Sequence, residues 1–137
     1  MKILISGEAK KLMCGKRNAK DYPHWDKLLE LLKDHEIKKI EGRHSVQEMV
    51  DMVNWCDVWI SIDSFLPHMV KYYGLKRGIV LWSKSDPLIF GYPENINLLK
   101  DKRKLRPDQF RWWEDVEYDE SAFVQPEEIQ SIINNFS

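Results

Sequence analysis

Two short apolar runs, DVWISI at residues 57–62 and GIVLW at residues 78–82, constrain the fold of this chain more than any other feature. Each has the length of one strand, and neither alternates apolar with polar residues as a strand with one exposed face does. Continuous runs rich in β-branched and aromatic residues are typical of strands buried on both faces of a parallel sheet. A similar run over residues 2–7 ends at Gly7 and predicts the first strand of the same sheet.

Segments with helical spacing separate these runs. Apolar residues recur at that spacing over residues 25–32, which predicts a first helix. Ser45 with Glu48 has the spacing of a capping box ahead of an apolar stripe, which predicts a second helix. A third helix is expected over residues 67–73, ended by Gly74.

The order of these segments predicts the fold. Ile37 and Ile40 allow a short strand between the first two helices, so strands and helices alternate through the first part of the chain. We therefore expect one Rossmann-like α/β domain over residues 1–137, with three α/β/α layers, a mostly parallel sheet and right-handed crossovers. Residues 83–125, rich in proline, charge and aromatics, are expected to be mostly loop, and residues 127–136 to form a last helix.

Composition excludes several classes of protein. With 137 residues, of which 43% are hydrophobic, the chain suits one folded domain and not a disordered segment. It has 21 Lys and Arg against 22 Asp and Glu, so we expect no nucleic-acid partner, since duplex-binding proteins are usually basic. Two cysteines, Cys14 and Cys56, are too few for a disulfide framework or a zinc cluster, and we expect no metal site. Because no apolar run approaches the roughly 20 residues of a membrane span, we expect no span and a cytoplasmic protein.

Three loops follow the predicted strands at their carboxyl ends, where open α/β sheets bind ligands. The second loop reads Asp63-Ser64-Phe65-Leu66-Pro67-His68, and the third, over residues 83–87, reads Ser-Lys-Ser-Asp-Pro. The first, over residues 7–20, carries five basic side chains: Lys10, Lys11, Lys16, Arg17 and Lys20. Because the strands are expected to be parallel, all three loops should lie at one edge of the sheet.

The second loop has the clearest chemistry. Pro67 suits the first turn of a helix, so the N–H groups at that helix start, together with the helix dipole, can bind a phosphate. Ser64 adds a hydroxyl donor, and Asp63 can accept hydrogen bonds from sugar hydroxyls. Alternatively, Ser64 only caps the helix and Asp63 only favours its N-terminus. His68 is a weak candidate for catalysis, because a single histidine more often makes a structural hydrogen bond.

The other segments are each open to two interpretations. The basic side chains of residues 10–20 could neutralise a diphosphate or could form a solvated face. Residues 83–85 could hold a phosphate or a sugar, or could form a tight turn ended by Asp86-Pro87. Trp112-Trp113, beside Glu114-Asp115, could stack on a base or could pin the long loop to the domain.

Together these segments resemble a known family. Residues 56–97 resemble the C-terminal, nucleotide-sugar-binding half of the family 9 glycosyltransferases, the heptosyltransferase-like group with the GT-B fold. The family pattern D-[ST]-x-x-x-H matches Asp63 through His68, and its G-x-[ST]-D-P loop is similar to Ser83-Lys84-Ser85-Asp86-Pro87. Upstream, Lys20-Asp21-Tyr22-Pro23-His24-Trp25 is similar to the family's K-x-W-P-x-x-W segment.

The resemblance implies a nucleotide-diphosphate-sugar donor and sugar transfer without a metal or other cofactor. It implies that Asp63 contacts the donor sugar, and that Lys20 balances the charge of the diphosphate. It also implies that Ser64 and the backbone N–H groups of the two residues after it bind phosphate. In that family the acceptor site and the catalytic base belong to a second, N-terminal domain. We therefore expect an acceptor-domain partner chain or a homodimer, for which the aromatics of residues 110–118 are a candidate surface.

Two alternatives to the glycosyltransferase component stay open. Phe65 and Ser83 stand where the family often has glycine, which favours a non-catalytic nucleotide-sugar-binding or regulatory module. A nucleoside N-glycosyl transferase or hydrolase on a similar small fold would need a carboxylate nucleophile, and Asp63 or Asp86 could serve. The glycosyltransferase component is the interpretation that the ordered motifs favour.

Overall fold

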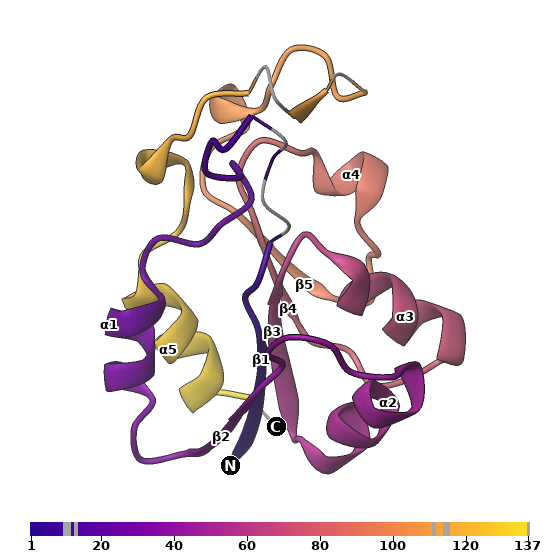
Figure 1. Cartoon of the computed structure of the whole chain (residues 1–137). Coiled ribbons are helices and arrows are strands. Elements are labelled where there is room, and N and C mark those ends of the chain that lie inside the picture. The colour runs from indigo at the N-terminus through magenta and orange to yellow at the C-terminus, as the bar shows by residue number, and fades with distance from the viewer. Residues whose placement is uncertain (10–11, 13, 111, 114–115, 137) are drawn as a thin grey trace.

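The computed structural model describes residues 1–9, 12, 14–110, 112–113 and 116–136. It contains one sheet of five parallel strands in the order β2-β1-β3-β4-β5. The strands are β1 (Lys2–Ser6), β2 (Glu36–Lys39), β3 (Val58–Ile62), β4 (Ile79–Trp82) and β5 (Ile96–Leu99). The expected Rossmann-like α/β fold is confirmed (Figure 1).

Helices cover both faces of the sheet (Figure 1). One face carries α1 (Trp25–Leu31) and α5 (Pro126–Asn134), and the other carries α2 (Val46–Trp55) and α3 (Phe65–Tyr73). Alternate side chains of β3 serve the two cores: Ile60 and Ile62 join the core under α1 and α5, and Trp59 joins the core under α2 and α3. Because both faces are covered, β3 is buried along its whole length, as its continuous apolar sequence predicts.

The strand order creates a switch point between β1 and β3. From β1 the chain passes through α1 to β2 on one side, and it then returns through α2 to β3 on the other side of β1. In open α/β sheets, ligands bind at the carboxyl ends of the two strands that flank such a point. Asp63 follows β3 directly and Gly7 follows β1 directly, so the first two predicted loops border this position.

Residues 83–125 are mostly loop in the described part of the segment, as expected, but two elements within them were not predicted. The segment contains α4 (Pro87–Phe90) and β5, which pairs with β4 at the edge of the sheet. All four residues of β5 are only partly buried, and Asn97 interrupts the apolar run, so the segment lacks the pattern of the central strands. Asn97 is used in tertiary structure, where its Oδ1 accepts a hydrogen bond from Trp82 Nε1 at 2.9 Å.

Helix α3 begins two residues earlier than expected, at Phe65. Ser64 before it has an extended backbone, with φ −149° and ψ −163°. Pro67 therefore lies at the third helical position, still within the first turn, where a helix has no use for its missing N–H. Gly74 ends the helix as expected, in the left-handed conformation with φ +63°.

The predicted capping box at the start of α2 is present. Glu48 N donates to Ser45 Oγ at 3.1 Å, and Ser45 N donates to Glu48 Oε1 at 3.0 Å. The hydrogen bonds from Ser45 hold the pKa of the Glu48 carboxyl below its usual range. A carboxyl with a lowered pKa stabilises the fold above its ordinary pKa, and this contribution is lost as the pH falls through the lowered value.

We expect Ser45→Ala to lower the free energy of unfolding by about 1 kcal/mol, because a helix N–H loses its acceptor. Urea denaturation at neutral pH measures the change. Ser45→Asp is the matched control, since it retains a capping oxygen and should stay close to the wild type. Equal losses in the two variants would contradict a capping role for Ser45.

Candidate functional site

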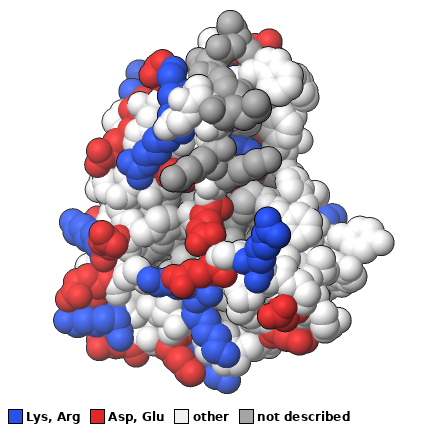
Figure 2. Space-filling view, viewed as in Figure 1, with Lys and Arg blue, Asp and Glu red and all other residues white. Residues whose placement is uncertain are grey.

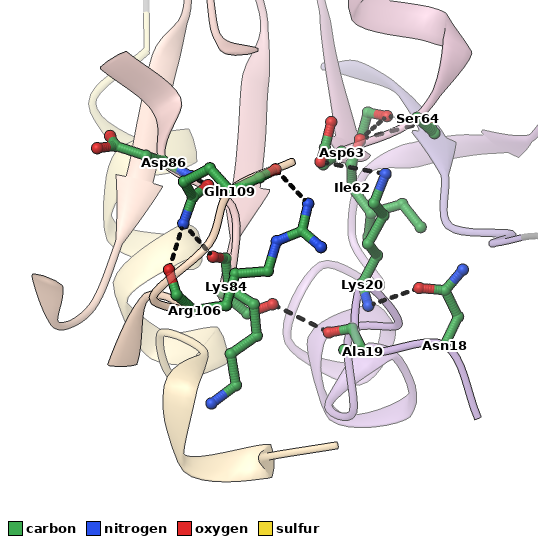
Figure 3. Close-up of polar contacts among 12 residues, drawn as sticks. Asn18, Ala19, Lys20, Ile62, Asp63, Ser64, Lys84, Asp86, Arg106 and Gln109 are labelled. Atoms are coloured by element: carbon green, nitrogen blue, oxygen red, sulfur yellow. Dashed lines mark hydrogen bonds and ion pairs between the residues drawn. The ribbon is translucent and has the colours of Figure 1, made fainter. Parts of the chain in front are cut away.

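The three predicted loops meet at the carboxyl edge of the sheet (Figure 3). Ser83 Oγ donates a hydrogen bond to the carbonyl of Ala19 at 2.9 Å, which joins the loop after β4 to the loop after β1. Lys20 Nζ lies 3.3 Å from Asp63 Oδ2, which joins the loop after β1 to the residue after β3. The ends of β1, β3 and β4 therefore contribute to one site, as expected for parallel strands.

The Lys20–Asp63 ion pair is partly withdrawn from solvent, with side chains that are 24% and 13% exposed. Lys20 is positioned by a turn in which its backbone N–H donates to Asn18 Oδ1 at 3.0 Å. Sheltering from water strengthens the interaction of both charged groups with any polar ligand beside them. Paired charges of this kind add little to stability after their desolvation cost, so the pair is better suited to binding than to holding the fold together.

The first turn of α3 begins next to this pair. Ser64 precedes the helix, but its hydroxyl makes no capping hydrogen bond. It donates to the carbonyl of Ile62 at 3.3 Å and lies 3.2 Å from Ser61 Oγ, so the interpretation of Ser64 as a side-chain cap is wrong. N–H groups in the first turn of a helix have no acceptor within the helix, which leaves those of Phe65 and Leu66 able to bind an anion.

Phe65 and Leu66 differ in what else they bring to the site. The side chain of Leu66 is packed in the core, with 2% of the residue exposed, so Leu66 can offer only its backbone. Phe65 is 55% exposed and carries an aromatic ring at the surface where the helix begins. The ring is therefore not needed to build the core, and position 65 can be varied to test the site.

His68 makes its contacts with a different segment. Its Nδ1 lies 2.7 Å from the hydroxyl of Tyr92, and the two rings meet edge to face with centroids 5.5 Å apart. Tyr92 belongs to the segment that leads into β5. The contact ties that segment to α3, which supports the structural interpretation of His68 over a catalytic one.

The third loop is mainly a turn into α4. Asp86 Oδ1 accepts a hydrogen bond from Leu88 N at 2.9 Å, so Asp86 caps α4 and Pro87 occupies its first position. Ser85 is buried, and Lys84 Nζ lies 3.6 Å from Asp119 Oδ2. These contacts support the interpretation of residues 83–87 as a structural turn that borders the site.

The basic side chains of the loop after β1 contact different parts of the domain. Lys16 Nζ lies 3.1 Å from Glu117 Oε1, and the guanidinium carbon of Arg17 lies 4.1 Å from the ring centroid of Tyr118. Lys10 and Lys11 lie outside the described residues. Lys20 is therefore the member of the predicted basic cluster that the structure brings to Asp63.

Arg106 and Gln109, which belong to no motif of the sequence, bring a fourth segment to this edge (Figure 3). Gln109 Oε1 accepts from Asp86 N at 2.7 Å, and its Nε2 donates to the carbonyls of Lys84 at 3.0 Å and Arg106 at 2.9 Å. Arg106 N donates to the carbonyl of Lys84 at 3.0 Å. The loop after β5 is thus fastened to the loop after β4 by hydrogen bonds that no local sequence pattern predicts.

Trp113 from the same segment contacts two cations of the site. Lys20 Nζ lies 4.7 Å from the ring centroid, and the guanidinium carbon of Arg106 lies 4.0 Å from it. Burial lowers the pKa of Arg106, and the charges of Asp108 and Asp63 oppose that effect. The indole ring thus packs against both cations of the site, whereas Glu114 and Asp115 lie outside the described residues.

A cavity of about 200 Å³ opens on the other side of β1, at the ends of β1 and β2. Its lining includes apolar Ile5 and Ile40 and the carboxylates of Glu8 and Glu41. Gly7 also borders it, and a Cβ at Gly7 would lie 2.7 Å from the indole of Trp25, so a side chain at position 7 would displace that ring. The cavity and the charged site at β3 thus lie at the same edge of the sheet, at the ends of different strands.

The remaining expectations concern membrane spans, metals and partners. Among the described residues, no helix combines the length and the apolar character needed to cross a membrane. No group of three or more His, Cys, Asp or Glu side chains in the described part of the chain is placed to share a metal ion.

The surface carries both signs of charge: acidic and basic side chains are interspersed over α1, α5 and β2 on the face shown in Figure 2. Of the aromatics of residues 110–118, Phe110 and Trp112 are each 79% exposed, whereas Trp113 and Tyr118 are partly buried.

Comparisons with protein-family models, with curated proteins and with solved structures each gave no match. These comparisons therefore show no family for the chain, and the resemblance of residues 56–97 to the family 9 glycosyltransferases stays an expectation from the sequence motifs. A function for the chain has to be inferred from those motifs and from the geometry of the site.

Proposed function

We propose that this chain is the donor-binding component of a glycosyltransferase and holds a nucleotide-diphosphate sugar at the carboxyl edge of its sheet. The observation that carries the proposal is the Lys20–Asp63 pair beside a helix start with no side-chain cap. The cation and the N–H groups of Phe65 and Leu66 suit a diphosphate, and the carboxylate suits sugar hydroxyls. A diphosphate joined to a sugar is a ligand that needs both kinds of group side by side.

The cavity at the ends of β1 and β2 offers a place for the nucleoside. Ile5 and Ile40 can pack against the face of a base, and Glu8 and Glu41 can accept hydrogen bonds from ribose hydroxyls. Because β1 lies between β2 and β3, a donor bound in this way would extend across the switch point of the sheet. Its sugar would then lie toward Asp63.

The reaction that fits such a site is direct displacement at the anomeric carbon. The bond from that carbon to the diphosphate oxygen breaks as the acceptor oxygen bonds to the carbon, and the acceptor proton passes to a base. Lys20 and the N–H groups at the start of α3 would stabilise the charge that develops on the departing diphosphate. We assign the acceptor site and the base to a partner chain or a second protomer.

One observation favours a non-catalytic nucleotide-sugar-binding module as the second candidate. Asp63 is ion-paired with Lys20 and Asp86 caps α4, so these two aspartates already have roles that compete with that of a base or nucleophile, and without a partner that supplies the base the site would bind the donor but not transfer its sugar. The same contacts weigh against a nucleoside hydrolase or N-glycosyl transferase, which would need one of these carboxylates as nucleophile. Sugar transfer or donor hydrolysis by the chain, alone or with an acceptor domain, would exclude the non-catalytic module.

Isothermal titration calorimetry with ADP, GDP, CDP and UDP and with a sugar conjugate of each tests the proposed function. We expect at least one nucleoside diphosphate to bind with a Kd of micromolar order, as about −8 kcal/mol of binding free energy would give. Absence of binding for the whole panel at millimolar ligand would overturn the proposal.

We expect Asp63→Ala to weaken binding of the nucleotide sugar about tenfold relative to the bare nucleoside diphosphate, because the sugar loses a charged acceptor. The bare diphosphate should bind as well as before or better, since Lys20 no longer shares its charge with a carboxylate. Calorimetry on the two ligands with wild type and variant measures the ratio. Equal losses for the two ligands would mean that Asp63 does not contact the sugar.

A further inference from the structure

We propose that Arg106 is a second diphosphate-binding cation and that it makes the site select nucleoside diphosphates over monophosphates. This inference rests on the proposed function, but it concerns a residue outside every motif of the sequence. Arg106 comes from the loop after β5, whereas Lys20 comes from the loop after β1 and Asp63 from the end of β3. Figure 3 shows the guanidinium of Arg106 directed toward the side of the site where Lys20 and Asp63 lie.

The two cations contact the same aromatic ring. The guanidinium carbon of Arg106 lies 4.0 Å from the ring centroid of Trp113, and Lys20 Nζ lies 4.7 Å from the same centroid. Two like charges in one site repel one another, and the repulsion is stronger where water is partly excluded. The carboxylate of Asp63 is held against Lys20 at 3.3 Å, and its charge also acts on Arg106.

Arg106 itself is held in place by three kinds of contact. Its backbone N–H donates to the carbonyl of Lys84, and its Nη2 donates to the carbonyl of Gln109. Gln109 in turn is fixed by hydrogen bonds to Asp86 and Lys84. A guanidinium on a fixed backbone that is also stacked on an indole loses little rotamer entropy when it binds a ligand.

The charges that face Arg106 explain why an anion would be stabilised there. Burial disfavours its charged form, and the carboxylates of Asp108 and Asp63 act in the opposite direction. A bound phosphate would add a stronger compensating charge and would match the planar fork of the guanidinium with two oxygens. Arg106 thus has the chemistry and the preorganised position of a phosphate ligand.

Because two separate groups of donors are available for phosphate, we expect the site to prefer a nucleoside diphosphate over a monophosphate. Lys20 and the N–H groups at the start of α3 come from the loops after β1 and β3 and suit one phosphate, whereas Arg106 comes from the loop after β5 and suits the other. A monophosphate can satisfy only one of these groups. Removal of Arg106 should therefore weaken a diphosphate strongly and a monophosphate little.

The test is calorimetry with a nucleoside diphosphate and the matching monophosphate, using the nucleoside that binds the wild type best. We expect Arg106→Gln to weaken the diphosphate about tenfold and to change the monophosphate less than about threefold, as loss of one charge-assisted contact gives. Arg103→Gln is the matched control: it lies in the same loop, its side chain is 90% exposed, and it pairs with Asp101. It should leave both affinities unchanged.

The other outcomes of this calorimetry would overturn either the role of Arg106 or the proposed function. Equal losses for the two nucleotides, or no loss, in a folded Arg106→Gln variant would overturn the role of Arg106 while the proposed function stands. No nucleotide binding in the wild type would overturn the proposed function itself. If Arg106→Gln does not fold, Arg106→Lys is measured in its place. We expect its preference for the diphosphate over the monophosphate to fall about threefold, because lysine lacks the planar fork of the guanidinium. An unchanged preference would overturn the inference.

Discussion

Replacing Gly78 with alanine is expected to lower the free energy of unfolding by about 3 kcal/mol, the upper part of the range for an overpacked core. Gly78 directly precedes β4, and a Cβ there would lie 2.1 Å from Cδ2 and 2.3 Å from Cε2 of Trp59. Trp59 is fully buried in β3, and its Nε1 donates to the carbonyl of Lys76 at 2.9 Å. The indole cannot move away without losing that hydrogen bond and its packing, so the new methyl group must strain the backbone.

Gly74→Ala is the control that separates crowding from backbone conformation. Gly74 has φ +63°, and apart from its chain neighbours and the adjoining helix backbone no heavy atom of the described residues lies within 4 Å of a Cβ built there. Its replacement should cost only the roughly 1 kcal/mol of a left-handed alanine. Urea denaturation of both variants gives the comparison, and equal losses would contradict crowding as the cause. Combining Gly78→Ala with Trp59→Leu should cost less than the two single losses together, because the leucine vacates the space that the methyl group needs.

The contact between Gly78 and Trp59 also matters for the site. It lets the indole of Trp59 lie across the start of β4, which pairs with β3 through Ile60 with Ile79 and Ile62 with Leu81. This register ends both strands at the same edge and delivers Asp63 and Ser83 there. The stability of the core and the geometry of the candidate site therefore depend on the same close packing.

The central fold could be predicted from sequence because burial on both faces leaves a local pattern. β3 and β4 are continuous apolar runs, and the capping box at Ser45 is a short-range signal that needs no tertiary contact. β5 could not be found in this way. It lies at the edge of the sheet with only partial burial, and it includes Asn97, whose reason for being in the strand is a hydrogen bond to Trp82.

For the candidate site, too, the sequence predicts some contacts and misses others. The meeting of Lys20 with Asp63 follows from topology, since parallel strands flanking a switch point bring their following loops together. The approach of Arg106 does not, because it depends on Gln109 bridging three backbone groups of two loops that are distant in sequence. The sequence marks Trp113 as a candidate aromatic, but it does not predict the contacts of Trp113 with Lys20 and Arg106, which depend on how the loop after β5 is held against the loop after β4.

Phe65→Pro is expected to weaken nucleoside diphosphate binding by about 10- to 100-fold while leaving the fold intact. Phe65 is the first residue of α3, a position that favours proline, and Ser64 before it is already extended, as the residue preceding a proline prefers. The substitution removes one backbone N–H, which the helix itself does not use. If that N–H donates to a phosphate, its loss removes a charge-assisted hydrogen bond of about 1.5–3 kcal/mol.

Phe65→Ala isolates the N–H group from the side chain. It removes the same ring, of which 55% of the residue is exposed, but it retains the donor. It should therefore bind the diphosphate within about threefold of the wild type, a difference under about 1 kcal/mol. Thermal unfolding of both variants checks that α3 is preserved, and calorimetry measures the affinities. Because the two variants differ chiefly at one hydrogen-bond donor, equal affinity in Phe65→Pro and Phe65→Ala would place the diphosphate away from the start of α3.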